Sequence, residues 1–407
     1  MTSLIALAAA AAISTPVLAA EPLKAEVIHW WTSGGEAAAV KVFADAYNKA
    51  GGQWVDSAIA GGDAARAAGI NRIVGGNPPT MMQFNTGKQL DELVKNDFLA
   101  NLDAAASAGN WKAVLPKAIL NASMRNGHFY ALPVNIHGQN WVFFNQKAFA
   151  EAGITAPKTW EDVLADGPKL KAKGIIPLAH GGQKWQDKIL FDAVLAGDGG
   201  AALFRKVYSP DAQAAIADPK FKQVAETFKK LRGLMDEGMP GRNWNDATAM
   251  VITGKAGMQV MGDWAKGEFL AAHQTAGKEY GCAVIGSGYI MGGDVFVFPK
   301  LKSAEGTAAQ ALLEKVMFSP ETQIAFNMKK GSVPVRTDVE ATGMDSCAQQ
   351  GMTALKDPER QLPSVSYLIS PDEDGALQDV VTQYLNTPAE TSSEFVSKFA
   401  AAVKASG

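Results

Sequence analysis

The chain has 407 residues, 19% of them charged, and a formal net charge of −3 at pH 7. This balance excludes the basic footprint of a nucleic-acid-binding protein and argues against a polyanionic or membrane-surface partner. Because domains usually span about 100–200 residues, the length favours two domains, which can bury a core without a metal or a disulfide.

The first twenty residues differ from the rest. Leu4 to Ala12 is an apolar run, and Val17 to Ala20 ends in small residues. This pattern predicts a secretory signal peptide over residues 1–20, although no Lys or Arg precedes the apolar run. A buried N-terminal helix is the alternative. No Cys stands near the cleavage point, so we expect a periplasmic protein without a lipid anchor.

The chain has two cysteines, Cys282 and Cys347. In an oxidising compartment they can form a disulfide, and two buried free thiols are the alternative. The five histidines show no zinc-ligand spacing, so we expect no metal and no other cofactor.

Strands and helices alternate along the first part of the chain. Glu26 to Trp31 predicts a strand, and Glu36 to Ala50 predicts a helix with apolar residues at helical spacing. Further strands are expected at 54–59 and 81–84, with a helix at 63–74 between them. Residues 127–134 resemble a hairpin.

The alternation continues after residue 140. We expect strands at 141–145, 175–179, 256–261, 282–285 and 294–298. Helices are expected at 146–152 and 160–173, with one or two in 211–238 and a mostly helical tail from Asp372. This order predicts an α/β protein of two lobes, each a mostly parallel sheet flanked by helices.

Trp30 and Trp31 stand at a strand end, and Glu36 follows at a helix start. Ligands bind beyond the carboxyl ends of strands in such sheets, an indole suits the apolar face of a sugar ring, and a carboxylate accepts hydrogen bonds from hydroxyls. Adjacent strand residues point to opposite faces, so one of the two tryptophans can equally belong to the core.

Other tryptophans have polar neighbours that suit a sugar site, namely Trp141, Trp185, Trp244 and Trp264. Trp141 follows the polar stretch from Asn135 through His137 to Asn140. Each of these four can also be a core residue. We interpret Trp54, Trp111 and Trp160 as structural.

A hydrolase is the main alternative class. Glu36, Asp263 and Asp294 could supply the two carboxylates that glycoside hydrolysis requires, but no local pattern fixes such a pair. No nucleophile elbow, P-loop or H-E-x-x-H sequence occurs. We therefore expect a binding protein and not an enzyme.

Six landmarks in order resemble the family 1 extracellular solute-binding proteins of ABC sugar transporters. They are Ile28-His29-Trp30-Trp31-Thr32, Gly76-Asn77-Pro78-Pro79, Tyr130-Ala131-Leu132-Pro133, Pro157-Lys158-Thr159-Trp160-Glu161-Asp162, Gly254-Lys255-Ala256-Gly257-Met258 with Gly262-Asp263-Trp264, and Lys330-Gly331-Ser332-Val333-Pro334-Val335-Arg336. Within this family the chain is most similar to the proteobacterial periplasmic glucose-binding branch.

The resemblance implies a periplasmic binding protein fold of type II, with a ligand cleft between two lobes. It implies chain crossings near Asn135, Asp294 and residue 340. The expected N-terminal lobe is then 21–135 plus 294–340, and the C-terminal lobe is 136–293 plus 341–407.

The resemblance also implies a cleft that binds a sugar, with a hexose such as glucose as the expected ligand. With the candidates above, the expected ligand-binding residues are Trp30, Trp31, Glu36, Gln83, Asn85, His137, Trp244, Trp264, Asp294 and Lys330. Relatives often have a cation where Asn85 stands and a His in the late loop, where residues 364–370 of this chain contain Tyr367 and no His. These differences alter the hydrogen-bond donors, so a small glycoside also fits.

The implied partners are a small sugar and an ABC permease in the inner membrane, with the protein itself a monomer. Two alternatives remain, a secreted carbohydrate-active enzyme and the same fold binding a polyol or other small solute. Zwitterions usually require an Arg and a carboxylate, whereas tryptophans favour sugars.

Overall fold

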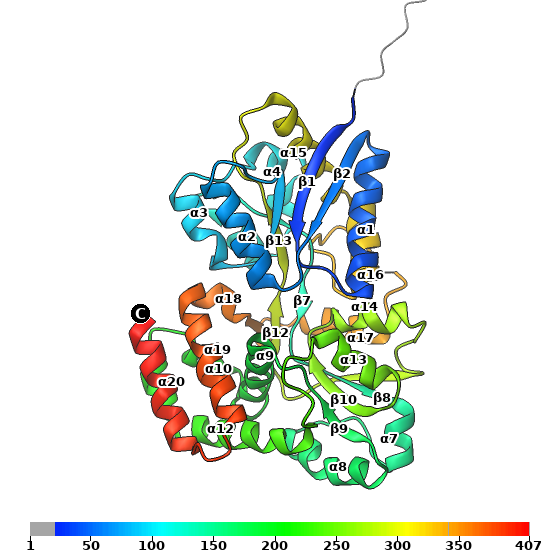
Figure 1. Cartoon of the computed structure of the whole chain (residues 1–407), viewed down its shortest axis with the longest axis vertical. Coiled ribbons are helices and arrows are strands. Elements are labelled where there is room, and N and C mark those ends of the chain that lie inside the picture. The colour runs from blue at the N-terminus through cyan, green and yellow to red at the C-terminus, as the bar shows by residue number, and fades with distance from the viewer. Residues whose placement is uncertain (1–20, 341, 407) are drawn as a thin grey trace, which may run out of the picture.

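The computed structural model describes residues 21–340 and 342–406. The expected signal peptide over residues 1–20 lies outside these described residues. Figure 1 shows two lobes stacked along the long axis, with strands running between them. Each lobe contains a sheet flanked by helices, which confirms the two-lobed α/β fold class. In the described part of the chain, no helix is long and apolar enough to cross a membrane.

The first lobe contains a five-stranded sheet in the order β2-β1-β3-β13-β6. Its strands are β1 (Leu23–His29), β2 (Gly52–Ala58), β3 (Met81–Asn85), β6 (Leu132–Pro133) and β13 (Asp294–Val297). Side chains alternate between its faces: Val27 and Met81 pack with the helices α1 (Gly34–Lys49), α15 (Ala304–Met317) and α16 (Pro320–Lys330). Ile28 and Met82 pack on the other face with α2 (Gly62–Val74).

The second lobe contains a four-stranded sheet in the order β11-β8-β10-β9. Its strands are β8 (Trp141–Asn145), β9 (Ile176–Ala179), β10 (Ala256–Met261) and β11 (Tyr280–Val284). One face packs against α8 (Trp160–Ala172), α9 (Lys184–Val194), α12 (Pro219–Leu231), α19 (Pro371–Asn386) and α20 (Ser392–Ser406). The other face packs against α13 (Trp244–Ile252) and α14 (Ala265–Ala271).

The remaining elements are short. The strands are β4 (Met124–Arg125), β5 (His128–Phe129), β7 (His137–Gly138), β12 (Tyr289–Gly292) and β14 (Gln361–Pro363). The helices are η1 (Lys88–Leu90), α3 (Asp91–Lys95), α4 (Asp103–Ala108), α5 (Trp111–Val114), α6 (Lys117–Ser123), α7 (Gln146–Ala152), η2 (Leu195–Gly199), α10 (Gly200–Val207), α11 (Ala212–Ile216), η3 (Arg232–Leu234), α17 (Ser346–Ala354) and α18 (Val365–Leu368).

The strand directions differ from the prediction of mostly parallel sheets. In the first lobe β1 is parallel to β2 and β3, but β13 is antiparallel to both of its neighbours. In the second lobe only β9 and β10 are parallel. Strand β13 enters the first sheet from the other lobe, so it runs in the reverse direction. Both sheets are therefore mixed, and the prediction on this point is wrong.

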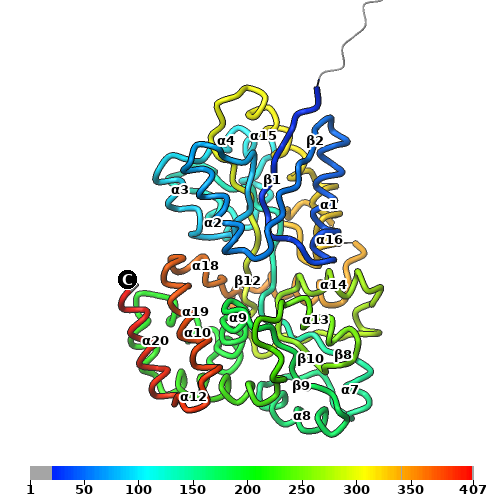
Figure 2. The backbone as a smooth tube through the Cα atoms, in the orientation of Figure 1, coloured from blue at the N-terminus to red at the C-terminus, as the bar shows by residue number. Residues whose placement is uncertain are grey.

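The chain passes between the lobes beside the centre of the molecule (Figure 2). Strand β6 leads into β7, and β12 leads into β13, so each connection joins the first sheet to the three-stranded sheet β14-β12-β7. The segment after α16 lies beside the first of these connections, because Ile136 and Val333 exchange backbone hydrogen bonds of 2.8 and 3.0 Å.

Of the two alternatives for the cysteines, the structure has the disulfide. Cys282 in β11 and Cys347 in α17 are bonded across a sequence separation of 65 residues. The bridge therefore ties α17 to β11, which is an edge strand of the second sheet.

Candidate functional site

The carboxylate of Asp294 is the centre of a buried polar cluster between the lobes. Asp294 begins β13 and lies opposite Asn85 of β3. Its Oδ1 accepts a hydrogen bond from Gln83 Nε2 at 2.9 Å, and its Oδ2 accepts one from Asn135 Nδ2 at 2.8 Å. Gln83 Oε1 in turn accepts from the backbone N–H of Trp30 at 3.1 Å. Three predicted site residues are thus linked by hydrogen bonds.

His137 connects this group to the second lobe. Its Nε2 lies 3.0 Å from Asp294 Oδ2, and its Nδ1 lies beside Asp263 Oδ1. The other oxygen of Asp263 accepts from the N–H of Gly138 at 2.8 Å. The indole of Trp264 meets the imidazole edge-on, with ring centroids 5.1 Å apart.

Glu36 and Lys330 form the third part of the cluster. Ser33 caps α1 by accepting from the backbone N–H of Glu36, and its hydroxyl donates to Glu36 Oε2 at 3.1 Å. Lys330, at the end of α16, places its Nζ 2.9 Å from Glu36 Oε1, and the ammonium lies 6.0 Å from the ring centroid of Trp264. Gly331 ends this helix at a φ of 85°, and a Cβ there would lie 2.6 Å from the Asp263 carbonyl oxygen. Only glycine fits this approach.

Charge stabilises the centre of the cluster. Burial opposes a charge on His137, but the carboxylates of Asp263 and Asp294 outweigh burial and raise the pKa of His137. Burial likewise opposes ionisation of Asp294, but its hydrogen bond to His137 and the charges of His137 and Lys330 lower the pKa of Asp294. We infer an imidazolium held between two carboxylates.

The two adjacent tryptophans have different environments. Trp31 is 1% exposed and packs between Phe296 and Phe326, with centroids 5.6 and 5.3 Å away. Trp30 is half-buried, and the guanidinium of Arg66 lies 5.7 Å from its ring centroid. Trp30 is therefore the more accessible of the two rings, and Trp31 belongs to the core of the first lobe.

Two other predicted residues lie outside the hydrogen-bonded cluster. Asn85 is half-buried and is paired with Asp294 in the strand register. The backbone N–H of Asn85 donates to Gln89 Oε1 at 3.0 Å. Trp244 is half-buried at the start of α13, and in the described residues its ring contacts no other aromatic ring of the cluster.

Asn135 and Arg66 were not among the predicted site residues, and Asp263 was a candidate only as a hydrolase carboxylate. Asn135 both donates to Asp294 Oδ2 and accepts from the Asp294 N–H at 2.7 Å. Arg66 lies one turn after Asp63 on α2 and ion-pairs with it. Asn135 could have been selected from the sequence, because it is a polar residue at an expected chain crossing between the lobes.

The lobes are closed around the cluster. The N–H of Gly35 donates to Glu268 Oε1 at 2.8 Å, which joins α1 of the first lobe to α14 of the second. On the opposite flank, Ser366 Oγ donates to the Thr86 carbonyl at 2.8 Å. Glu36, His137, Asp294 and Lys330 are each 6% exposed or less in this arrangement.

No group of three or more His, Cys, Asp or Glu residues is placed to hold a metal ion in the part of the chain that is described. The chemistry that these residues offer is hydrogen bonding from carboxylate, amide, ammonium and imidazole groups, next to two half-buried indoles. A fold of this kind, with such groups where the lobes meet, defines a solute-binding protein.

Comparison with known proteins identifies the family. The model for "Bacterial extracellular solute-binding protein" matches residues 31–324. A "Probable sugar-binding periplasmic protein" of Rhizobium meliloti is 38% identical over 411 residues, covering 98% of both chains. The chain therefore belongs to the bacterial extracellular solute-binding protein family, which confirms the resemblance.

Solved structures confirm the architecture. A "Chitin oligosaccharide binding protein" has a TM-score of 0.78 at 20% identity and covers 95% of this chain and 99% of its own. The solute receptor AcbH, described as preferring β-D-galactopyranose, also has a TM-score of 0.78, at 18% identity, and covers 94% of this chain and 98% of its own. At this identity the likeness shows the fold alone.

Proposed function

We propose that the protein is the periplasmic sugar-binding component of an ABC transporter, that residues 1–20 direct its export, and that its ligand is a hexose such as glucose. The observation that carries this proposal is the interlobe cluster itself. Its residues come from distant segments of the chain, and hydrogen bonds and ring contacts connect them into one group. They are Trp30, Glu36, Gln83, His137, Trp264, Asp294 and Lys330. The named relative of Rhizobium meliloti supports a sugar as the ligand.

A neutral sugar suits these groups chemically. Its hydroxyls lose their hydrogen bonds to water on binding, so the site must replace them. Glu36 and Asp294 accept such bonds, Lys330 donates them, and Trp30 and Trp264 offer indole faces to the ring. A micromolar dissociation constant requires about 8 kcal/mol. A few charge-assisted bonds of about 1.5–3 kcal/mol each, with stacking, reach this value after ordering costs.

The groups of the cluster also bond to one another. The pair between Lys330 Nζ and Glu36 Oε1 at 2.9 Å is the clearest case. When the lobes open, both groups reach water, and when the lobes close on a sugar, its hydroxyls take their place between them. A buried charge left without a partner is costly, so each of the two groups needs either the other or a ligand hydroxyl.

The proposed moving bodies are residues 21–135 plus 294–340 and residues 136–293 plus 341–407. Hinge motion between two such bodies needs only a few connecting residues to change conformation. The polar flank contacts described above would then form only on closure. The closed monomer is the form that we propose to dock on an inner-membrane permease.

A hydrolase is disfavoured by the same geometry. Glycoside hydrolysis requires two carboxylates that face each other across the bond to be cleaved. Here Asp263 and Asp294 bond to opposite nitrogens of His137, and Glu36 pairs with Lys330. We propose that the protein binds and releases its ligand unchanged.

Titration calorimetry with glucose, galactose, mannose and small glycosides tests the proposal. We expect at least one sugar to bind, with binding strongly weakened in Lys330→Gln. Lys329→Gln is the matched control, because Lys329 is the exposed neighbour on α16. No heat with any sugar would contradict the proposal, and a polyol that binds alone would redirect it to that ligand class. Release of product from aryl glycosides would indicate the enzyme.

A further inference from the structure

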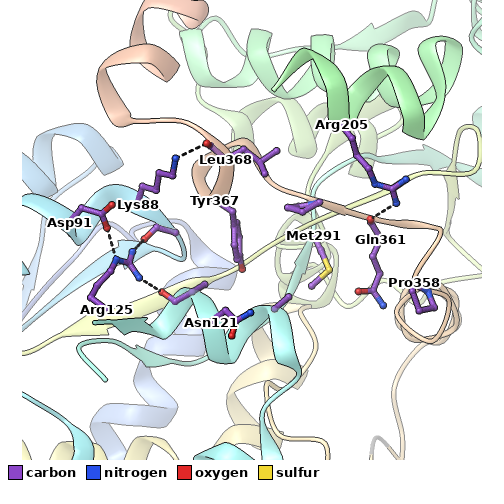
Figure 3. Close-up of a pocket in the computed structure, with 14 residues that line it drawn as sticks. Lys88, Asp91, Asn121, Arg125, Arg205, Met291, Pro358, Gln361, Tyr367 and Leu368 are labelled. Carbon is purple, nitrogen blue, oxygen red and sulfur yellow. Dashed lines mark hydrogen bonds and ion pairs between the residues drawn. The ribbon is translucent and has the colours of Figure 1, made fainter. Parts of the chain in front are cut away.

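One cavity of the described structure lies away from the tryptophans. It has a volume of about 680 Å³ and lies where η1, α6 and α18 meet (Figure 3). Both lobes line it. The first lobe contributes Gly87, Lys88, Asp91, Ala118, Asn121, Ala122 and Arg125, and the second contributes Arg205, Met291, Pro358, Gln361, Pro363, Tyr367 and Leu368.

Tyr367 supplies an aromatic ring to the wall of this cavity. Its ring lines the cavity, and Figure 3 shows it standing between Lys88 and Met291. Burial raises the pKa of the Tyr367 hydroxyl, and the charge of Asp294 adds to the increase.

The charges around the cavity are unbalanced. It is lined by the three cations Lys88, Arg125 and Arg205 and by the single carboxylate of Asp91. Asp91 forms an ion pair with Arg125, whose Nε lies 2.6 Å from Asp91 Oδ1. Lys88 bonds to the Leu368 carbonyl at 2.7 Å and has no carboxylate in ion-pair contact within the described chain. The wall therefore favours an anion.

Arg205 is the cation best placed to bind one. Its Nη2 donates to the carbonyls of Glu359 and Gln361 at 3.0 and 3.1 Å, which fixes the guanidinium. Its Nε and Nη1 have no partner among the described residues, so they remain available. Guanidinium groups bind carboxylates through strong charge-assisted hydrogen bonds. Figure 3 shows Arg205 at one end of the cavity, with Lys88 and Arg125 at the other.

Apart from Asn121 and Gln361, the rest of the wall is apolar. Tyr367, Met291, Pro363, Leu368 and Ala122 supply a ring face and aliphatic surface. Small-molecule sites are typically concave and largely apolar, with a few polar groups that orient the ligand. We propose that this cavity is a second binding site, separate from the sugar cluster, for a small carboxylate that carries an apolar ring. The carboxylate bonds to Arg205, and the ring packs on Tyr367.

Because both lobes form the wall, an occupant contacts both only in this closed arrangement. A ligand that favours one arrangement raises the affinity of any second ligand that favours the same one, and the effect is reciprocal. The carboxylate should therefore strengthen sugar binding. This coupling rests on the proposed sugar function, whereas binding of the carboxylate itself does not.

Phenylacetate and phenylacetamide are the probes, because they share a ring and differ in charge. Calorimetry without sugar should show phenylacetate binding about tenfold tighter or more than the amide. Arg205→Gln should remove that difference. Lys206→Gln, at the exposed neighbour on α10, should keep it. Ala122→Phe, which fills the cavity, should weaken both probes and provides a second variant should Arg205→Gln not fold.

The outcomes separate the two proposals. Equal affinity for the two probes, no binding of either, or an unchanged preference in Arg205→Gln would overturn the second site. Competition between phenylacetate and the sugar would overturn it too, since it would place the probe in the sugar site. If no sugar binds but phenylacetate binds through Arg205, the second site stands while the proposed sugar function fails.

Discussion

His137 lies between two carboxylates, and this residue links the folded interior to pH. Its pKa is raised above the ordinary value of 6.5, so the stability that it contributes is fully present below pH 6.5 and is lost as pH rises through the folded pKa. Asp294 acts in the opposite sense. Its pKa is lowered from 3.8, so its contribution is present above pH 3.8 and is lost as pH falls through the folded pKa.

We therefore expect the free energy of unfolding to fall above about pH 6.5 in the wild type, by up to about 1.4 kcal/mol per pH unit. His137→Gln should have a lower free energy of unfolding at pH 6 and a smaller decline. Urea denaturation from pH 5.5 to 9 measures both curves. His128→Gln, which removes an exposed imidazole, serves as the control. Parallel curves for wild type and His137→Gln would contradict the imidazolium.

The adjacent tryptophans give a second residue-scale prediction. Trp31→Ala should reduce the free energy of unfolding by about 3–5 kcal/mol, because it empties a packed site between two phenylalanines. Trp30→Ala should weaken sugar binding by about tenfold or more with a much smaller loss of stability. Denaturation and calorimetry on both variants check this. The reverse assignment of the two effects would show that Trp30 is the core residue.

At the scale of elements, we expect the contact of α1 with α14 to control the proposed closure of the lobes. A Cβ on Gly35 would lie 2.4 Å from the Gly267 carbonyl carbon, whereas a Cβ on Gly34 would meet only Glu268 Oε2 at 3.7 Å. Gly35→Ala should thus hold the lobes apart and weaken sugar binding, and Gly34→Ala should not. Calorimetry compares the two variants. Equal affinities would show that this contact is not required for closure.

The disulfide between β11 and α17 is also an element-scale constraint. In the loop-entropy model a bridge that closes 65 residues stabilises the protein by roughly 4 kcal/mol. Reductant should lower the free energy of unfolding of the wild type by an amount of this order. The variant Cys282→Ser with Cys347→Ser should start at the lower value and not respond. If reduction leaves the wild type unchanged, the bridge does not constrain the unfolded chain.

Much of the element order could be predicted from the sequence, because apolar runs such as 141–145 and 256–261 are buried strands. Strand direction could not, since a strand buried on both faces has the same pattern in either direction. Helix α9 was missed for a different reason. Its Lys188 and Asp192 are buried and pair at 2.7 Å, so polar residues interrupt its apolar face.

At the scale of the whole molecule, the site depends on segments that no local pattern connects. The resemblance to the family indicated Glu36, Asp294 and Lys330, but the pairing of Glu36 with Lys330 follows only from the packing of α1 on α16. Likewise, His137 was a candidate site residue because its neighbours in the sequence are polar. Its role between Asp263 and Asp294 depends on how the lobes meet.

A crystal structure with the tightest-binding sugar of the calorimetric series tests the central claim most directly. We predict a sugar between the lobes, hydrogen-bonded to Glu36, Asp294 and Lys330, with its ring against the indole of Trp30 or Trp264. The Lys330–Glu36 pair should then be replaced by bonds to sugar hydroxyls. A sugar bound anywhere else, including the cavity at Arg205, would contradict the claim.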